Sequence, residues 1–244
     1  MQVLPWFTEI ATILGLFSVP GKIILPNQLS GGLCFNQVYY AMGNAYFDSR
    51  VQAREIHKKL YDYYGIEAAV CPPAKILVVR RQDEFRDYFN LNTVKHTVEK
   101  FGYPVDYFHF NANLTAREQA LKISQYGLII SPHGSQLANL IFAQQRAAVI
   151  ELVPMSFGVE FYRVGRGNSM HYQLVEQGYP VSSQVTYEEF LDIRAKVQNG
   201  EKPGPKFHAI KNAKYAIDPT ALETAINNSL AYLKNISNCS NWKK

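Results

Sequence analysis

Residues 128–153 read LIISPHGSQLANLIFAQQRAAVIELV, two apolar runs separated by a polar turn and a helical pattern. The runs at 128–131 and 147–153 are typical of buried strands, and SQLANLIFA at 135–143 is typical of a helix between them. A strand, a helix and another strand form the unit from which parallel sheets are built. This stretch therefore predicts an α/β fold with a parallel sheet.

The same alternation of strands and helices extends toward the N-terminus. The further predicted elements are KILVVRR at 75–81, LNTVKHTVEKFG at 91–102, VDYFHF at 105–110 and TAREQALKISQYG at 115–127. In the last of these, Thr115 and Glu118 have the spacing of a capping box, which marks a helix start. Together these elements predict a Rossmann-like half with a parallel sheet.

The segment before this region has a different character. WFTEIATILGLF and FDSRVQAREIHKKLYDYYG carry apolar residues at helical spacing, and Pro72-Pro73 is a predicted hinge. We therefore predict a reduced N-terminal lobe over residues 1–70. Residues 71–244 are expected to form the Rossmann-like domain, which ends in a helix.

The charge of the chain favours an anionic ligand. Its 244 residues are 47% hydrophobic and carry a net charge of +5, with a pI near 9.0. This composition is that of a globular protein. Lys and Arg are scattered, without the dense basic runs of a nucleic-acid-binding arm. We therefore expect a small phosphate-bearing ligand and no nucleic-acid partner.

The cysteines and the N-terminus favour a cytoplasmic protein, or one of the host cytoplasm if the chain is viral. Cys34, Cys71 and Cys239 lie far apart without a CxxC pair, so we expect reduced thiols and neither a zinc site nor a disulfide. The apolar N-terminus lacks a basic n-region and predicts neither a signal peptide nor a membrane span. Asn-X-Ser/Thr sequons, which would matter only in a secreted chain, begin at Asn113, Asn227, Asn235 and Asn238.

The turn HGSQ at 133–136 is a candidate anion site. It lies between a predicted strand and a predicted helix, and parallel sheets bind ligands beyond the carboxyl ends of their strands. Gly134 permits close approach of the backbone, the first helix amides are unpaired donors, and His133 and Ser135 add side-chain donors. A phosphate or pyrophosphate suits this turn. The alternative is a structural turn in which Ser135 is only the helix N-cap.

A second polar cluster follows the strand at 75–81. It consists of Arg80, Arg81, Arg86 and Asn90. Planar guanidinium groups suit phosphate, so two anion-binding loops would share one edge of the sheet. The alternative is a solvated charge patch, because Asp83, Glu84 and Asp87 lie among the arginines. Glu151 ends the strand at 147–153 on the same edge, where it would accept from two ribose hydroxyls or be a simple surface charge.

These residues resemble glycosyltransferase family 61, which includes plant β-1,2-xylosyltransferase and animal O-GlcNAc transferases. The resemblance covers residues 75–178 and the C-terminal half of the family. It rests on Arg81, Arg86 and Asn90, on the block HGSQLANLIF and on VIELVP. In that block His133, Gly134, Leu137 and Asn139 fall on family positions. Ser135 and Gln136 replace the family's alanine and glycine.

The resemblance implies a GT-B-like architecture and an inverting, metal-independent transfer from a UDP-sugar to an oligosaccharide or glycoprotein glycan. No metal ligands and no cofactor are expected, and the sequence contains no DxD-type acidic pair in a strand-end loop. UDP-xylose and UDP-GlcNAc are both donors in the family, and xylose suits a site narrowed by Gln136. On the N-terminal, acceptor-side lobe, Asp48 is the candidate general base. Its alternative role is a helix N-cap.

Features of the sequence bear on three other classes of function. A non-catalytic nucleotide- or glycan-binding module derived from a glycosyltransferase stays open, because the N-terminal lobe is short. A serine hydrolase using Ser135 is disfavoured by the absence of a GxSxG elbow. A Rossmann dehydrogenase or methyltransferase is disfavoured because no GxGxxG follows a predicted strand.

Overall fold

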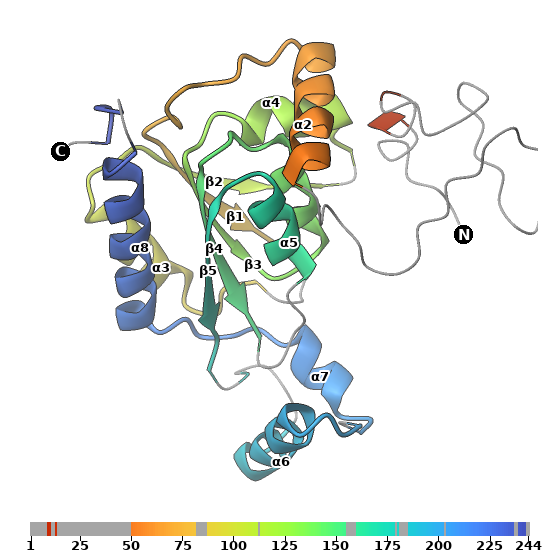
Figure 1. The fold of residues 1–244 in the computed structure, drawn as a ribbon. Coiled ribbons are helices and arrows are strands. Elements are labelled where there is room, and N and C mark those ends of the chain that lie inside the picture. Colours follow the sequence, from red (N-terminus) through yellow and green to blue (C-terminus); the bar gives the residue numbers. More distant parts are fainter. Residues whose placement is uncertain are drawn as a thin grey trace, which may run out of the picture.

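A computed structural model describes residues 9–10, 13, 50–81, 87–111, 113–154, 160–178, 180, 185–202, 204–236 and 239–242. Within these residues the chain forms one five-stranded parallel sheet with the strand order β2-β1-β3-β4-β5 (Figure 1). The strands are β1 (Ile76–Arg80), β2 (Val105–His109), β3 (Leu128–Pro132), β4 (Ala148–Val153) and β5 (His171–Glu176). The predicted parallel α/β sheet is confirmed. The sequence did not predict β5.

The strand order places a topological switch point between β1 and β3. From β1 the chain crosses to β2 on one side, and from β2 it returns past β1 to β3 on the other side. Crossover helices on opposite sides leave a crevice at the carboxyl ends of the two strands where the direction changes. By this rule, a ligand is expected at the ends of β1 and β3.

Helices cover both faces of the sheet. They are α2 (Arg50–Tyr64), α3 (Leu91–Glu99), α4 (Ala116–Ile123), the 3-10 helix η2 (Ser135–Phe142), α5 (Glu160–Gly167) and α8 (Pro219–Lys234). Two further helices, α6 (Tyr187–Gln198) and α7 (Phe207–Asn212), lie away from the sheet and share a separate small apolar cluster (Figure 1). The Thr115 and Glu118 capping box predicted from the sequence is present at the start of α4. The predicted helix at 135–143 forms, but with 3-10 geometry.

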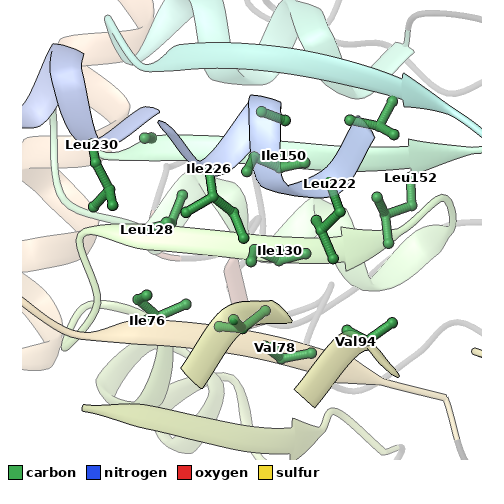
Figure 2. Close-up of a cluster of buried hydrophobic side chains, with 14 of the residues drawn as sticks. Ile76, Val78, Val94, Leu128, Ile130, Ile150, Leu152, Leu222, Ile226 and Leu230 are labelled. Atoms are coloured by element: carbon green, nitrogen blue, oxygen red, sulfur yellow. The ribbon is translucent and has the colours of Figure 1, made fainter. Parts of the chain in front are cut away.

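Each face of the sheet has its own apolar core. On one face α3 and α8 pack over Ile76, Val78, Ile130 and Ile150 (Figure 2). On the other face α2, α4, η2 and α5 cover the alternate strand residues, such as Leu77. Strands buried on both faces are almost continuously apolar, because successive side chains point to opposite sides. This is why β1, β3 and β4 could be recognised from the sequence.

Helix α2 belongs to the second of these cores. Leu60 and Tyr64 are buried there, His57 Nε2 donates to the Ala143 carbonyl at 2.9 Å, and Tyr61 donates to the Phe142 carbonyl at 2.8 Å. The division of the chain at residue 70 remains a prediction. No helix in the described part of the chain is long and apolar enough to cross a membrane.

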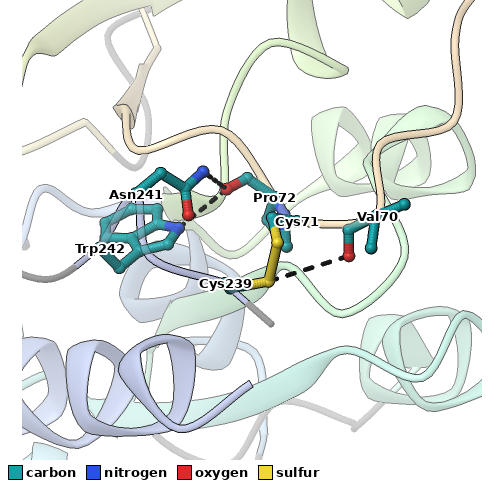
Figure 3. The surroundings of a disulfide bond; sticks show 6 residues. All are labelled: Val70, Cys71, Pro72, Cys239, Asn241 and Trp242. Atoms are coloured by element: carbon teal, nitrogen blue, oxygen red, sulfur yellow. Dashed lines mark hydrogen bonds between the residues drawn. A yellow bond between two sulfur atoms is a disulfide. The ribbon is translucent and has the colours of Figure 1, made fainter. Parts of the chain in front are cut away.

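The expectation of reduced thiols is wrong for two of the three cysteines. Cys71 and Cys239 form a disulfide that joins the segment before β1 to the segment after α8 (Figure 3). Asn241 and Trp242 hold this junction, since both side chains donate to the Pro72 carbonyl at 2.9 Å. No pattern in the sequence indicates the pairing, because the two cysteines are 168 residues apart and lie side by side only in the folded chain.

Candidate functional site

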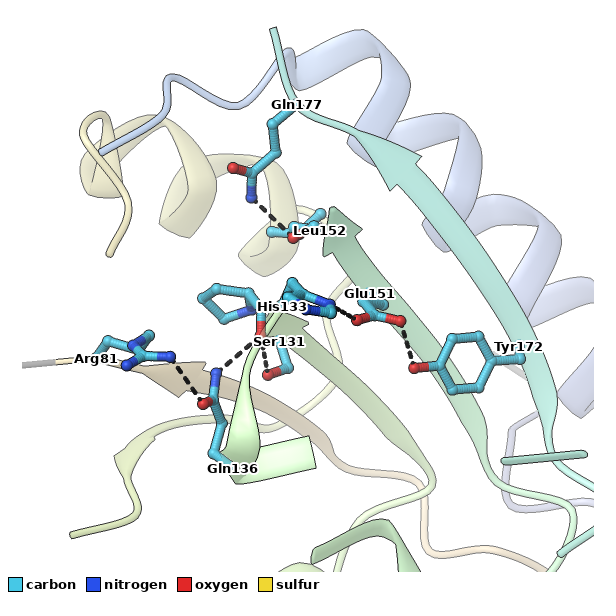
Figure 4. A network of polar contacts seen from close by, with 9 residues as sticks. Arg81, Ser131, His133, Gln136, Glu151, Leu152, Tyr172 and Gln177 are labelled. Atoms are coloured by element: carbon cyan, nitrogen blue, oxygen red, sulfur yellow. Dashed lines mark hydrogen bonds and ion pairs between the residues drawn. The ribbon is translucent and has the colours of Figure 1, made fainter. Parts of the chain in front are cut away.

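The candidate site lies at the switch point, where the end of β1 meets the turn after β3 (Figure 4). Arg81 directly follows β1, and its Nη1 donates to Gln136 Oε1 at 3.2 Å. Gln136 Nε2 in turn donates to the Pro132 carbonyl at 2.8 Å. The two loops that the sequence marked as suited to an anion are therefore in direct contact.

Gly134 allows this contact. Its φ of 156° and ψ of 177° lie in a region that residues with a side chain rarely adopt. A Cβ at this position would lie 2.2 Å from Arg81 Nη1 and 2.6 Å from Gln136 Oε1. The glycine thus creates the space that both side chains occupy.

The 3-10 helix η2 begins at Ser135, whereas it would begin at Gln136 if Ser135 were its N-cap. Gly134 occupies the N-cap position without a side-chain cap, and the exposed Ser135 is the first residue of η2. The proposed alternative role of Ser135 as N-cap is therefore wrong. The first amides of a helix have no acceptor within it and carry partial positive charge. They add anion-binding capacity next to Arg81.

Behind the turn lies a buried chain of hydrogen bonds from His133 through Glu151 to Tyr172 (Figure 4). His133 Nδ1 donates to Glu151 Oε1 at 2.6 Å, and the Tyr172 hydroxyl donates to Oε2 at 2.6 Å. Glu151 is 0% exposed and His133 is 6% exposed. Burial raises the pKa of Tyr172 well above its ordinary value, and the charge of Glu151 adds to this shift. Tyr172 is therefore a neutral donor.

This arrangement changes the role expected for Glu151. A fully buried carboxylate whose two oxygens accept from His133 and Tyr172 is not a surface charge, and it contacts these side chains where a ribose had been expected. A carboxylate can only accept, so the proton of the shared hydrogen bond is assigned to His133 Nδ1. Glu151 thus fixes the orientation of the imidazole.

Tyr172 could be read from the sequence only as one of several aromatic residues with a flat face for a sugar ring, and its hydrogen bond to Glu151 was not predicted. Its place depends on Gly165 in α5. A Cβ on Gly165 would lie 2.3 Å from Cδ2 of the Tyr172 ring. The signal available in the sequence was weak, because β5 is an edge strand with half-exposed residues and HYQLVE reads as neither fully apolar nor regularly alternating.

Arg80 and Asn90 have partners within the protein, contrary to the ligand roles expected for them. Arg80 forms a two-point ion pair with Asp87, at 3.1 Å from Nε and 2.6 Å from Nη2. The Asn90 amide donates to the Ile217 carbonyl and accepts from the Ile217 N–H, both at 2.9 Å. The charge-pairing alternative thus holds for Arg80, and Asn90 links two segments of backbone.

Of the remaining residues expected in the site, Leu137 and Asn139 are buried. Leu137 is 2% exposed and belongs to the apolar core, so it supports the turn without facing a ligand. Asn139 is also buried, at 8%. Arg86 and Asp48 lie outside the described residues. In the part of the chain that the structure describes, there is no group of three or more His, Cys, Asp or Glu side chains placed to hold a metal ion.

Comparison with known proteins identifies the family of the chain. The family model described as Glycosyltransferase 61 matches residues 1–150, more than half of the 244 residues. A segment of 81 residues, 33% of the chain, is 31% identical to a β-1,2-xylosyltransferase of Oryza sativa subsp. japonica. That segment spans only 17% of the rice protein. The family match includes Arg81 and the block HGSQLANLIF, and it confirms the predicted family: the chain belongs to glycosyltransferase family 61.

Proposed function

We propose that this chain binds a UDP-sugar at the β1/β3 switch point and transfers the sugar to a hydroxyl of an oligosaccharide or glycoprotein glycan. The observation that carries the proposal is the contact between Arg81 and the HGSQ turn. A guanidinium beside a helix N-terminus supplies oriented N–H donors and positive charge, which a diphosphate requires. Gly134 supports the proposal, because backbone without a side chain can approach phosphate oxygens closely.

For the reaction we propose an inverting displacement that needs no metal ion and no cofactor. The acceptor hydroxyl attacks the anomeric carbon on the face opposite the diphosphate. The bond from that carbon to the β-phosphate oxygen breaks, and UDP leaves with the bonding electrons. Arg81 and the first amides of η2 would stabilise the charge that develops on the departing diphosphate. Asp48 remains our candidate for the base that accepts the hydroxyl proton.

In this scheme His133 contacts the donor, while Glu151 and Tyr172 position it. The hydrogen bond from His133 Nδ1 to Glu151 holds the imidazole in one orientation at the turn. Because Glu151 is buried and Tyr172 satisfies its second oxygen, the carboxylate stays in place when the ligand enters or leaves. Ser135 and Gln136 complete the donor side.

We further propose that the described sheet is the donor half of a GT-B-like enzyme and that UDP-xylose is its preferred donor. Gln136 stands where the family has glycine, and its side chain lies between Arg81 and the Pro132 carbonyl. A narrower site favours a sugar without a hydroxymethyl group at C5. The name of the rice relative, a β-1,2-xylosyltransferase, supports the same donor.

Calorimetric titration with UDP, UDP-xylose, UDP-GlcNAc and UDP-glucose tests the proposal, each with EDTA and with Mn²⁺. We expect binding of UDP and of one UDP-sugar that does not depend on the metal ion. Arg81→Ala should weaken UDP binding by about 1.5–3 kcal/mol, the value of one charge-assisted hydrogen bond. Arg54→Ala, which removes an exposed arginine from α2, is the control with the same change in net charge.

The outcomes distinguish a glycosyltransferase from a non-catalytic binding module. A folded protein that binds none of these nucleotides would overturn the donor site. Binding with no transfer to any glycan in an acceptor screen would favour the non-catalytic binding module. If Arg81→Ala and Arg54→Ala weaken UDP binding equally, Arg81 acts only through overall charge and does not belong to the site.

A further inference from the structure

The disulfide between Cys71 and Cys239 is integral to the fold. Trp242 is 0% exposed and, with Asn241, donates to the Pro72 carbonyl next to Cys71. These contacts bring the two cysteines to a Cα–Cα distance of 5.4 Å, which is typical of a disulfide. The pairing therefore follows from the packing of the C-terminal segment and is not a chance approach of two surface thiols.

This disulfide changes the compartment expected for the protein. Disulfides form and persist in secretory and extracellular compartments and are rare in the cytosol, where thiols are kept reduced. Its formation removes two electrons and two protons from the thiols, which a disulfide-bonded oxidoreductase of the secretory pathway accepts. The sequons set aside under a cytoplasmic expectation then become relevant, because chains that enter this pathway are exposed to N-glycosylation.

The sequon at Asn113 is the one best suited to carry a glycan. Asn113 and Thr115 are both exposed, in the turn between β2 and α4. The Asn113 backbone N–H donates to Asn111 Oδ1 at 2.9 Å, and the Thr115 hydroxyl donates to Glu118 Oε2 at 2.8 Å. These hydrogen bonds are local to the turn and its cap. The tripeptide can therefore open without disturbing the sheet, and a glycan on the Asn113 side chain meets no core residue.

The sequon in α8 is less suitable. Asn227 lies on the exposed side of that helix, but Ser229 is 0% exposed and its hydroxyl accepts from Gln173 Nε2 at 2.7 Å. Both residues belong to continuous helix, which would have to unwind to present the tripeptide. Asn235 is the C-cap of the same helix. Asn238 lies outside the described residues and precedes the disulfide-bonded Cys239.

We propose that Asn113 is an N-glycosylation site of this protein. In the transfer, the Asn113 amide nitrogen forms a bond to the anomeric carbon of an oligosaccharide carried on a lipid diphosphate. The bond between that carbon and the diphosphate oxygen breaks. The lipid diphosphate leaves with the bonding electrons, and the amide nitrogen loses one proton.

The test is expression of the full chain behind a secretory leader in eukaryotic cells. The protein is digested with peptide N-glycosidase in ¹⁸O water, which converts a glycosylated Asn into ¹⁸O-labelled Asp, and the peptides are mapped by mass spectrometry. We expect the label at Asn113. Asn113→Gln should remove one glycan from the intact mass, whereas Thr115→Ser should keep it, because serine preserves both the sequon and the hydroxyl that caps α4.

An unlabelled Asn113 peptide from secreted, disulfide-bonded protein overturns the proposal, even if another sequon carries a glycan. If Asn113→Gln does not fold, the labelled peptide from the wild-type chain still decides the question. Free thiols at Cys71 and Cys239 in the secreted protein would overturn the inference about the compartment, which rests on that disulfide.

Discussion

Removal of the Cys71–Cys239 disulfide should destabilise the protein by an amount that follows from the chain topology. The bond closes a loop between residues 168 positions apart, which is most of the chain. In the loop-entropy model, a cross-link over such a loop lowers the entropy of the unfolded chain. It thereby stabilises the folded state by about 5 kcal/mol. Domains of this size are stable by only about 5–15 kcal/mol. We therefore expect Cys71→Ser/Cys239→Ser to lose a third or more of the free energy of unfolding.

Urea unfolding followed by circular dichroism measures this loss. The midpoint should fall, and the m-value should rise, because an unfolded chain without the cross-link exposes more surface. Wild-type protein treated with reductant should match the double variant, while Cys34→Ser should match oxidised wild type. A loss below about 1 kcal/mol, with unchanged m-value, would refute the loop-entropy reasoning for this bond. If the free energy of unfolding falls in the double variant but not in reduced wild-type protein, the serine side chains, and not the lost disulfide, cause the destabilisation.

Three further predictions concern single side chains. Gly134→Ala should displace the Arg81 side chain, because its Nη1 would lie 2.2 Å from the new Cβ. Calorimetry should then show UDP binding weakened by about tenfold or more, and an unchanged affinity would contradict the role of Gly134. Tyr172→Phe removes the hydroxyl that donates to the buried Glu151, so the free energy of unfolding measured in urea should fall by about 1–3 kcal/mol. An unchanged free energy of unfolding would show that Glu151 finds another donor. Burial lowers the pKa of His171, so the unfolded chain binds more protons and stability should decline below about pH 6.5. His171→Phe should therefore reduce the difference in melting temperature between about pH 7.5 and about pH 5.5, and an unchanged difference would exclude His171 as a cause.

The parts of the fold that could be predicted are those with strong local signals. β1, β3 and β4 are apolar on both faces, and Thr115 with Glu118 marks the start of α4. The start of α6 carries the same signature in Thr186 and Glu189, so it could have been recognised in the same way. The disulfide could not, since cysteines so far apart in sequence meet only through the packing of the C-terminal segment against the sheet.

The location of the candidate site could be predicted from the sequence, but most of its side-chain contacts could not. Strand ends in a parallel sheet lie on one edge, and this was enough to bring Arg81 and the HGSQ turn into one hypothesis. The pairing of Asp87 with Arg80 was one of two alternatives that the sequence left open, because both residues lie in one short segment. The pairing of Ile217 with Asn90 could not be seen, because Ile217 comes from a distant segment. The hydrogen bond from Tyr172 to Glu151 could not be predicted, because Tyr172 lies on β5, the strand that the sequence did not predict.

The alternation of side chains along a strand separates the two adjacent arginines. Successive residues point to opposite faces of the sheet. In β1 the alternation puts Ile76 and Val78 in the core beneath α8, and Leu77 and Val79 in the core beneath η2. Continued to the strand end, it puts Arg80 on the face of α8 and Arg81 on the face of η2. Arg81 is the arginine that contacts Gln136, while Arg80 pairs with Asp87.

The same alternation accounts for Glu151. It follows Val149 by two positions in β4, and Val149 is buried in the core beneath η2. Its carboxylate is therefore directed to the face on which Tyr172 also packs, and it accepts there from His133 and Tyr172. A carboxylate on an apolar face must find donors on that face, since burying it unpaired is costly. In this family member the face of each polar residue at the sheet edge, and not only its position along the chain, decides which side chains it can contact.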